Sequence, residues 1–160
     1  MAAHLLRKMA KKTPVRVMKF FGNLWFPYLG AGIKIVDATP DYRHMKVVLK
    51  RTWYNINYVG TQFGGSIYAM TDPFYMLMLI NILGPEYIVW DKGASIDFKS
   101  PGRSQLTANF DLTDEILETV RAKTAGGEKY VFDLNVDVID EAGVVVATVV
   151  KTLYVRRKKT

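Results

Sequence analysis

The 160-residue sequence contains no cysteine. Disulfide bonds, thiol nucleophiles and cysteine-ligated metal sites are therefore excluded, and a reducing compartment suits the chain. Histidine is nearly as scarce, because His4 and His44 are the only two and are not spaced as a pair of metal ligands. We therefore predict that the protein holds no metal ion.

Long apolar runs are also lacking. No window holds the roughly 18 uninterrupted apolar residues of a transmembrane helix, and residues 1–12 lack the apolar core and the cleavage site of a secretory signal. Hydrophobic residues make up 49% of the chain, which is enough for one substantial core. We expect a single cytoplasmic domain over residues 1–160, in which a basic helical extension over 1–28 precedes a core over 29–160.

Acidic residues are scarce in the first 60 positions, which hold 11 Lys/Arg against two Asp, whereas residues 61–160 hold 11 against 13. The formal net charge of +7 is therefore an N-terminal property. Such a patch attracts anionic lipids, nucleic acids or the phosphates of a nucleotide-bearing substrate. Because no nucleic-acid reading motif accompanies the basic residues, we predict no nucleic-acid partner.

Apolar residues recur at helical spacing between Val17 and Tyr28, with Arg16, Lys19 and Asn23 on the opposite side. This pattern predicts an amphipathic helix over residues 13–27. Its apolar face has three open interpretations: a brace or lid packed on the protein, a peripheral membrane contact, or a partner-binding face. Packing is the default, because an apolar stripe at this spacing usually meets a core.

The segment 65–83 has almost no polar face, which is typical of a helix buried on all sides. Thr113 is placed to cap a later, shorter helix. Strand patterns occupy six other segments: 33–38, 42–50, 87–99, 104–112, 130–138 and 144–155. A curved antiparallel sheet wrapped around one long buried helix satisfies this order, which is the α+β arrangement called the hotdog fold.

The segment from Asn57 to Asp72 contains the residues best suited to take part in a reaction. Its order of an asparagine, two glycines at 64 and 65, and a helical aspartate resembles the signature of hotdog thioesterases of the phenylacetyl-CoA type. The close of the chain, Lys151 to Val155, looks most like a hotdog branch of uncharacterised function. The resemblance implies an acyl-CoA hydrolase, with coenzyme A present as part of the substrate and no other cofactor. It also implies a homodimer or homotetramer with pockets between subunits.

Position by position, the resemblance assigns catalysis to Asp72, Asn57 and Gly64. The Gly64 N–H and the Asn57 side chain would hold the thioester carbonyl, where developing negative charge is stabilised. Asp72 would act as general base or nucleophile, and its apolar neighbours lead us to expect a desolvated carboxylate. The resemblance also implies substrate contacts at five positions: Thr61, Phe63, Gly65, Tyr68 and Asp91.

Several of these residues have structural explanations as well. Asp72 precedes Pro73, an order favoured at helix starts, so its carboxylate could cap a restarted helix. Gly64-Gly65 could form a tight turn, and Asp91 could be an exposed charge on a strand.

Phe63 departs from the family pattern, because it stands where these enzymes have a histidine. The substitution keeps the backbone donors and the aspartate, yet it favours acyl binding over hydrolysis. Two alternatives to a hydrolase therefore stay open. One is a non-catalytic acyl carrier, whose methionine-rich helix suits a pocket of variable filling, and the other is a membrane-surface structural protein.

Overall fold

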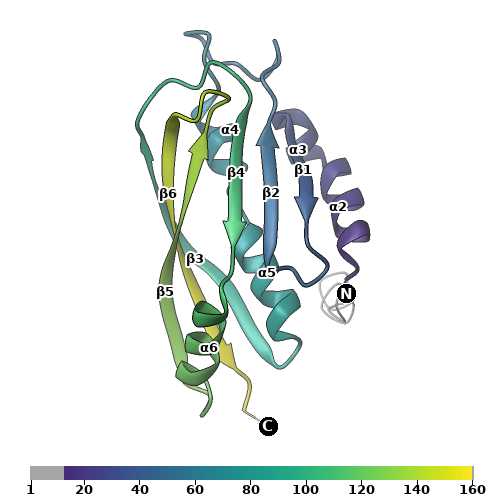
Figure 1. Ribbon diagram of the computed structural model, residues 1–160, viewed down its shortest axis with the longest axis vertical. Coiled ribbons are helices and arrows are strands. Elements are labelled where there is room, and N and C mark those ends of the chain that lie inside the picture. Colours follow the sequence, from purple (N-terminus) through teal and green to yellow (C-terminus); the bar gives the residue numbers. More distant parts are fainter. Residues whose placement is uncertain (1–12, 160) are drawn as a thin grey trace.

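The computed structural model describes residues 13–159, which form one curved antiparallel sheet with the helical segment 64–83 packed behind it (Figure 1). The strands follow the order β1-β2-β4-β5-β6-β3. Their bounds are β1 Ile33–Ala38, β2 His44–Leu49, β3 Tyr87–Phe98, β4 Leu106–Asp111, β5 Lys129–Ile139 and β6 Val145–Arg157. The helices are α2 Val15–Leu24, α3 Phe26–Ala31, α4 Gly64–Ala69, α5 Phe74–Leu83 and α6 Asp114–Lys123.

The six predicted strands are all present, and their bounds differ from the expected ones by a few residues. β6 pairs with β5 on one side and β3 on the other, so it lies inside the sheet and not at an edge. The β5–β6 connection turns at Gly143, whose φ of 81° is readily adopted by glycine. Thr113 caps α6 as predicted, because its Oγ1 accepts a hydrogen bond from the Ile116 N–H at 3.3 Å.

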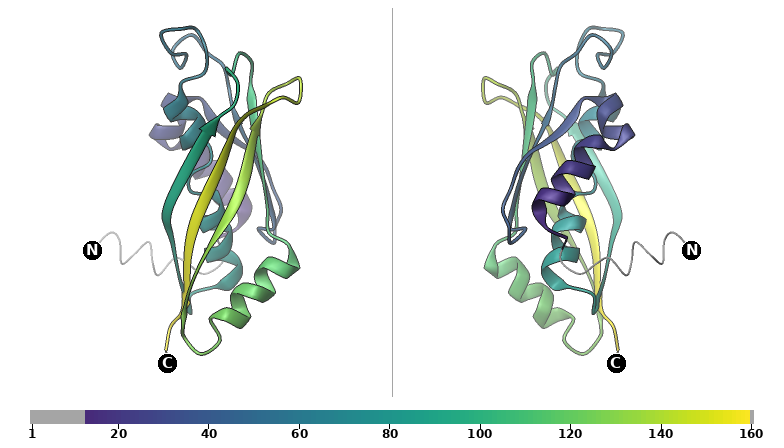
Figure 2. Two further views of the ribbon diagram at one scale, coloured as in Figure 1. Left: turned by 90° about the vertical axis from the view of Figure 1, so that its left-hand side faces the viewer. Right: turned by 90° about the vertical axis from the view of Figure 1, so that its right-hand side faces the viewer.

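One continuous core lies between the sheet and α5, and this arrangement confirms the predicted hotdog fold (Figure 2). Phe74, Met78 and Leu79 of α5 are fully buried and meet apolar side chains of the strands, including Phe110 on β4. The segment Gly64–Leu83 is long and apolar enough to span a membrane by composition alone. Half of it is buried, and it lies against the sheet.

The predicted long buried helix over Gly64–Leu83 is present and consists of two segments, α4 and α5. Residues 70–73 form a turn between α4 and α5, and Asp72 lies in that turn. The capping interpretation of Asp72 is wrong, because Pro73 occupies the N-cap position of α5 and no side chain caps that helix. The Asp72 carboxylate is therefore available for other contacts.

The predicted N-terminal helix is broken at Trp25 into α2 and α3, and its orientation is the reverse of the expected one. Asn23 lies against the free edge of β1, where its side chain accepts from the Ile35 N–H at 2.7 Å and donates to the Ile35 carbonyl at 3.0 Å. Lys19 donates to the carbonyl of Val36. Asn23 and Lys19 thus brace the sheet, and the apolar stripe faces outward from Val17 to Trp25, whereas Tyr28 is buried. Residues 1–12, with their basic positions and His4, lie outside the described residues.

Candidate active site

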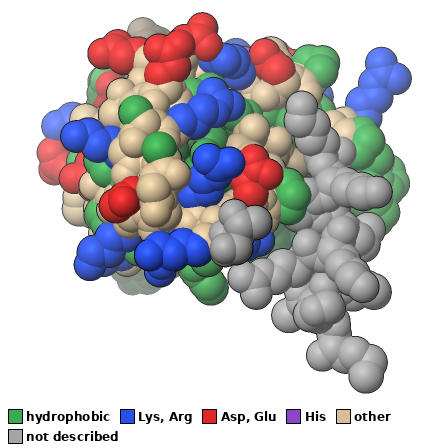
Figure 3. Space-filling model, turned by 90° about the horizontal axis from the view of Figure 1, so that it is seen from below, with side chains coloured by type: hydrophobic (Ala, Val, Ile, Leu, Met, Phe, Trp, Pro, Cys, Tyr) green, Lys and Arg blue, Asp and Glu red, His purple; other side chains and the backbone are tan. Residues whose placement is uncertain are grey.

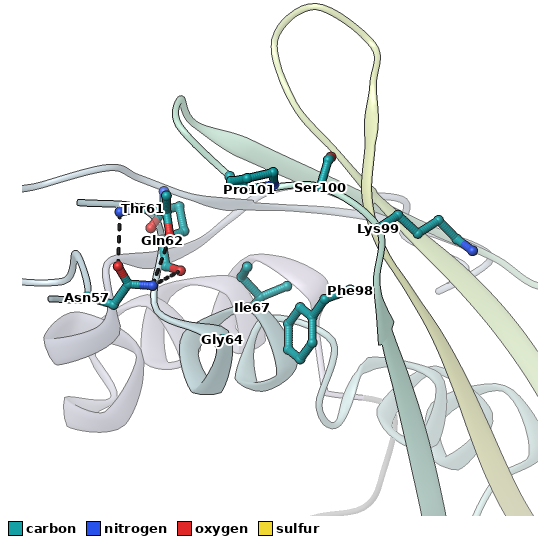
Figure 4. A pocket seen from close by; sticks show the side chains of 10 residues that line it. Asn57, Thr61, Gln62, Gly64, Ile67, Phe98, Lys99, Ser100 and Pro101 are labelled. Atoms are coloured by element: carbon teal, nitrogen blue, oxygen red, sulfur yellow. Dashed lines mark hydrogen bonds between the residues drawn. The ribbon is translucent and has the colours of Figure 1, made fainter. Parts of the chain in front are cut away.

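The loop between β2 and α4 is held in shape by Asn57. Its side-chain Oδ1 accepts from the N–H groups of Val59 at 3.1 Å and Thr61 at 3.0 Å. Its Nδ2 donates to the Thr61 hydroxyl at 2.8 Å and to the Gln62 carbonyl at 3.3 Å (Figure 4). Since an amide nitrogen carries two hydrogens, both donors of Asn57 are occupied within its own loop.

A cavity of about 390 Å³ opens beside this loop. The start of α4 forms one wall, and the end of β3 with the following turn forms the other (Figure 4). Its lining residues are Asn57, Thr61, Gln62, Gly64, Ile67, Phe98, Lys99, Ser100, Pro101 and Gly102. The Phe98 ring lies so close to Gly64 that a Cβ at this position would be 3.0 Å from it. A side chain at position 64 would therefore require the Phe98 ring to shift.

Phe63 and Gly65 lie on the other side of the same helix start. The Phe63 ring covers Gly65, where an added Cβ would be 2.4 Å from a ring carbon. A second hollow of about 410 Å³ adjoins this exposed ring and is lined by Gly30, Ala31, Tyr54, Asn55, Ile56, Phe63 and Ser66. The family's histidine position is thus occupied by an apolar surface in this chain.

Three charged side chains meet where α4 ends. The Lys151 ammonium on β6 donates to Asp72 Oδ1 at 2.5 Å and lies 3.4 Å from Asp91 Oδ2 on β3. It also lies 5.6 Å from the centre of the Tyr68 ring, a distance suited to a cation–π contact. The Lys151 side chain is 1% exposed, Asp91 is 18% exposed, and Asp72 is 44% exposed. The buried ammonium therefore holds a carboxylate that solvent can still reach.

Burial sets the electrostatics of this cluster. Burial raises the pKa of Asp91 above its ordinary value, and the negative charge of Asp72 adds to this increase, while the Lys151 ammonium opposes it. Burial acts to lower the pKa of Lys151, but the hydrogen bond and charge of Asp72 and the charge of Asp91 outweigh it and raise that pKa. Lys151 is therefore held as a cation.

Tyr28 connects the cluster to the N-terminal helices. Its hydroxyl, on α3, donates to the backbone carbonyl of Asp72. Burial raises the pKa of Tyr28 far above its ordinary value, and the charge of Asp72 acts in the same direction. The turn that carries Asp72 is thus held from one side by α3 and from the other by β6.

The predicted site residues fall into two groups at opposite ends of α4. Asn57, Thr61 and Gly64 line the cavity at its start, with Phe63 and Gly65 beside it. Asp72, Asp91 and Tyr68 gather around Lys151 at its end. Asp72 does not line the cavity.

Two sequence-based expectations about the charges were wrong. Asp91 is not an exposed strand charge, because its side chain points inward beside Lys151. The desolvated carboxylate is Asp91 rather than Asp72, which keeps nearly half of its exposure.

Sequence reasoning missed Lys151, although a signal was present. On β6 it is in phase with Val149, Leu153 and Val155, which all face the core. A lysine in the apolar phase of a strand is rare unless its charge is paired. Within residues 13–159, no group of three or more His, Asp or Glu side chains is arranged to hold a metal ion.

Comparisons with known proteins place this fold among thioesterase-like structures. A family model described as Domain of unknown function (DUF4442) matches residues 14–155. No curated protein matches the chain significantly. A Pseudomonas aeruginosa protein of unknown function, described as a probable thioesterase, is 14% identical with a TM-score of 0.81, and the similarity covers 91% of this chain and 97% of that one.

Two further solved structures are similar to the chain. A thioesterase from Haemophilus influenzae is 15% identical with a TM-score of 0.65, covering 92% of this chain and 94% of that one. A hypothetical thioesterase from Streptococcus pneumoniae, solved with coenzyme A, is 20% identical with a TM-score of 0.54, covering 79% and 91%. At these identities the similarity shows the shared hotdog fold.

Proposed function

The chain belongs to the family described as Domain of unknown function (DUF4442), and we propose that it hydrolyses an acyl thioester such as an acyl-CoA. The observation that carries the proposal is the Asp72 carboxylate, which is open to solvent yet fixed by a fully buried ammonium at 2.5 Å. Perturbed charges gathered in this way are typical of functional sites, since packing alone gains little from them. The coenzyme A bound by the pneumococcal protein suits this substrate class.

The chemistry assigned to Asp72 is that of a general base. It takes a proton from water as the water oxygen attacks the thioester carbonyl carbon. The carbon–sulfur bond then breaks, and the protonated Asp72 returns this proton to the leaving sulfur, so that a carboxylic acid and a thiol are released. Lys151 fixes the direction of the carboxylate. The backbone N–H of Gly64, beside the cavity, is the group we assign to the carbonyl oxygen.

Within one chain, the Gly64 N–H and the Asp72 carboxylate lie at opposite ends of α4. The six-residue helix α4, about 9 Å long, lies between the cavity and Asp72. One carbonyl group, with a bond of about 1.2 Å, cannot accept from the Gly64 N–H and also be attacked by a water held at Asp72, because the two groups are too far apart. The proposed site is therefore completed by two copies, with Gly64 from one and Asp72 from the other, which makes the functional unit a homodimer.

A second candidate function is acyl binding without hydrolysis, and Asn57 favours it. Both of its side-chain donors are bonded within the loop, so no donor is left there for a substrate carbonyl. Phe63 adds an apolar wall where related enzymes have a histidine, and its exposed ring adjoins the 410 Å³ hollow. These features suit an apolar acyl chain and do not require a reaction.

Replacement of Asp72 tests the hydrolase proposal. We expect the purified protein to release free thiol from at least one member of a panel of acyl-CoAs of different chain length. Asp72→Asn should lower kcat/KM by roughly 100-fold or more, because it removes the general base. The matched control is Asp133→Asn, since Asp133 is an exposed β5 carboxylate that neither lines the cavity nor bonds to Lys151. That control should hydrolyse the substrate at the parent rate.

Two outcomes would exclude hydrolysis at Asp72. One is parent protein that turns over none of the acyl-CoAs, and the other is Asp72→Asn protein that turns them over as fast as the parent. Native mass spectrometry then tests the second candidate, acyl binding without hydrolysis. That candidate requires a copurified acyl ligand or a complex with added acyl-CoA.

A further inference from the structure

The outer side of α2 and α3 is an exposed apolar face. None of the residues of α2 is buried, and Phe26 on α3 is 85% exposed. We call this surface the helical apolar face, and its large members are Val17, Phe20, Phe21, Leu24, Trp25, Phe26 and Leu29. An apolar surface of this extent on a folded protein marks a place where something else binds.

The orientation of this face is fixed by the contacts beneath it. Asn23 and Lys19 bond to backbone groups of β1, which has no neighbouring strand on that side. Gly22 also sits so close to β1 that an added Cβ would be 2.8 Å from the Ile35 side chain. Turning the apolar stripe inward would break these bonds and leave polar groups of a sheet edge unpaired. The face is therefore built to point outward.

A second exposed apolar group adjoins the first. In the loop after β2, Trp53 is 86% exposed, and Tyr58 and Val59 are also exposed. The hollow of about 410 Å³ joins this loop to α3, because Gly30 and Tyr54 both line it. This loop, residues 50–63, therefore lies beside α3, and we call it the Trp53 loop.

Charges near the helical apolar face and the Trp53 loop have one sign. Residues 13–36 contain no acidic residue. Arg16 is exposed on α2, which carries the helical apolar face, and Lys34 is exposed on β1, which lies beneath it. Lys50 and Arg51 are exposed at the start of the Trp53 loop. The α6 end of the molecule differs, because acidic and basic side chains are mixed there (Figure 3).

We propose that the helical apolar face and the Trp53 loop dock on an anionic membrane surface. Trp, Phe and Leu side chains enter the boundary between head groups and acyl chains, while lysine and arginine meet the anionic head groups. A second copy of the chain fits this face less well, because a symmetric contact would bring the same basic residues together without an acidic partner. Nucleic acid could pair with the basic residues, but it would leave the exposed apolar side chains without a partner. This docking does not depend on hydrolysis at Asp72.

Vesicle flotation of the full chain tests the proposal. The protein should float with vesicles of phosphatidylcholine and phosphatidylglycerol, and much less with phosphatidylcholine alone. Added salt should weaken flotation, because it screens the head-group attraction. The double variant Phe20→Ser with Phe26→Ser should bind at least about tenfold more weakly, because two aromatic side chains no longer enter the lipid.

The control is Trp90→Ser, which removes an aromatic of similar exposure, 61%, from β3. Trp90 alternates with inward-facing Val89 and Asp91, so it lies on the outer face of the sheet. This variant should float like the parent. A second test variant, Arg16→Glu, leaves the aromatic side chains in place and should weaken flotation with anionic vesicles.

Three results would overturn the proposal. They are parent protein that does not float with anionic vesicles, double-variant protein that floats as well as the parent, and Trp90→Ser protein that is weakened as much as the double variant. If vesicles fail to bind while the double variant loses self-association in sedimentation, the helical apolar face is an interface between copies. Thermal melting establishes that each variant is folded before it is scored.

Discussion

Asp91 is the least satisfied charged group in the described part of the chain. Both of its carboxylate oxygens are buried and have no hydrogen-bond partner, and the Lys151 ammonium lies 3.4 Å away. The same ammonium already bonds to Asp72 at 2.5 Å. One lysine thus serves two carboxylates, and burial raises the pKa of Asp91 above its ordinary value.

This pairing predicts a pH-dependent difference between the parent and Asp91→Asn. The folded pKa of Asp91 is raised, so the unfolded chain ionises first as pH increases. The parent therefore loses stability relative to Asp91→Asn as pH rises from Asp91's ordinary pKa, near 3.8, through its raised value. Well below pH 3.8, Asp91 is protonated in both the folded and the unfolded chain, and its contribution to stability is fully present.

Urea denaturation at a series of pH values measures this difference. Exposed Asp97 provides the matched control, because Asp97→Asn should keep a nearly constant difference from the parent over the same range. A parent that gains stability relative to Asp91→Asn with rising pH would show that the Lys151 attraction outweighs the burial of Asp91.

At the scale of elements, the free edge of β1 is covered by side chains of α2, and Asn23 makes most of these bonds. Asn23 forms two hydrogen bonds with the backbone of Ile35, next to an irregularity in the β1–β2 register. An open sheet edge is usually protected from pairing with other chains, and here a helix covers it through side-chain bonds. α2 is therefore held on the sheet by these polar contacts as well as by the partly buried side chains of Val15 and Met18.

Removal of the Asn23 side chain should detach α2 from the sheet. Asn23→Ala leaves the Ile35 N–H and carbonyl without their partners, at a cost of about 1–3 kcal/mol. We expect faster amide hydrogen exchange at Ile35 and along α2, together with a lower denaturation midpoint. Asn109→Ala is the control, because Asn109 is exposed on β4, and it should leave exchange in α2 unchanged. Equal exchange in parent and Asn23→Ala would mean that the bonds contribute nothing measurable.

At the scale of the whole molecule, the sheet has a second edge that no helix braces in this way. β3 pairs with β6 on one side and has no strand on the other among the described residues. Most of its 12 residues are exposed or half-exposed. A second copy that pairs along this edge would bring further residues to the end of β3, where the cavity opens beside Phe98.

We therefore predict a homodimer, or a dimer of dimers, at micromolar concentration. Sedimentation velocity over a range of protein concentrations measures the mass of the particle against that of the 18.2 kDa chain. A dimer should persist at high salt if backbone pairing and apolar contacts hold it, because these are weakly screened. A monomer at all concentrations would contradict the prediction and also the two-copy site.

Local patterns in the sequence determined where most strands and helix ends lie. Strand positions follow from alternation of apolar and polar residues, which needs no knowledge of the partner strand, and they were predicted nearly to the residue. The Thr113 cap is equally local, since the bond it makes is three residues away. The motif from Asn57 to Asp72 indicated that a loop leads directly into the buried helix, because the two segments adjoin in sequence.

Long-range contacts decided the rest. The outward face of α2 follows from hydrogen bonds to β1, and amphipathic spacing alone cannot say which side meets the protein. Lys151 lies 79 residues from Asp72 in sequence, so the pairing of their charges depends on where β6 passes under α4. Burial of a charge is a property of its surroundings, and those surroundings exist only once the sheet has closed around the helix.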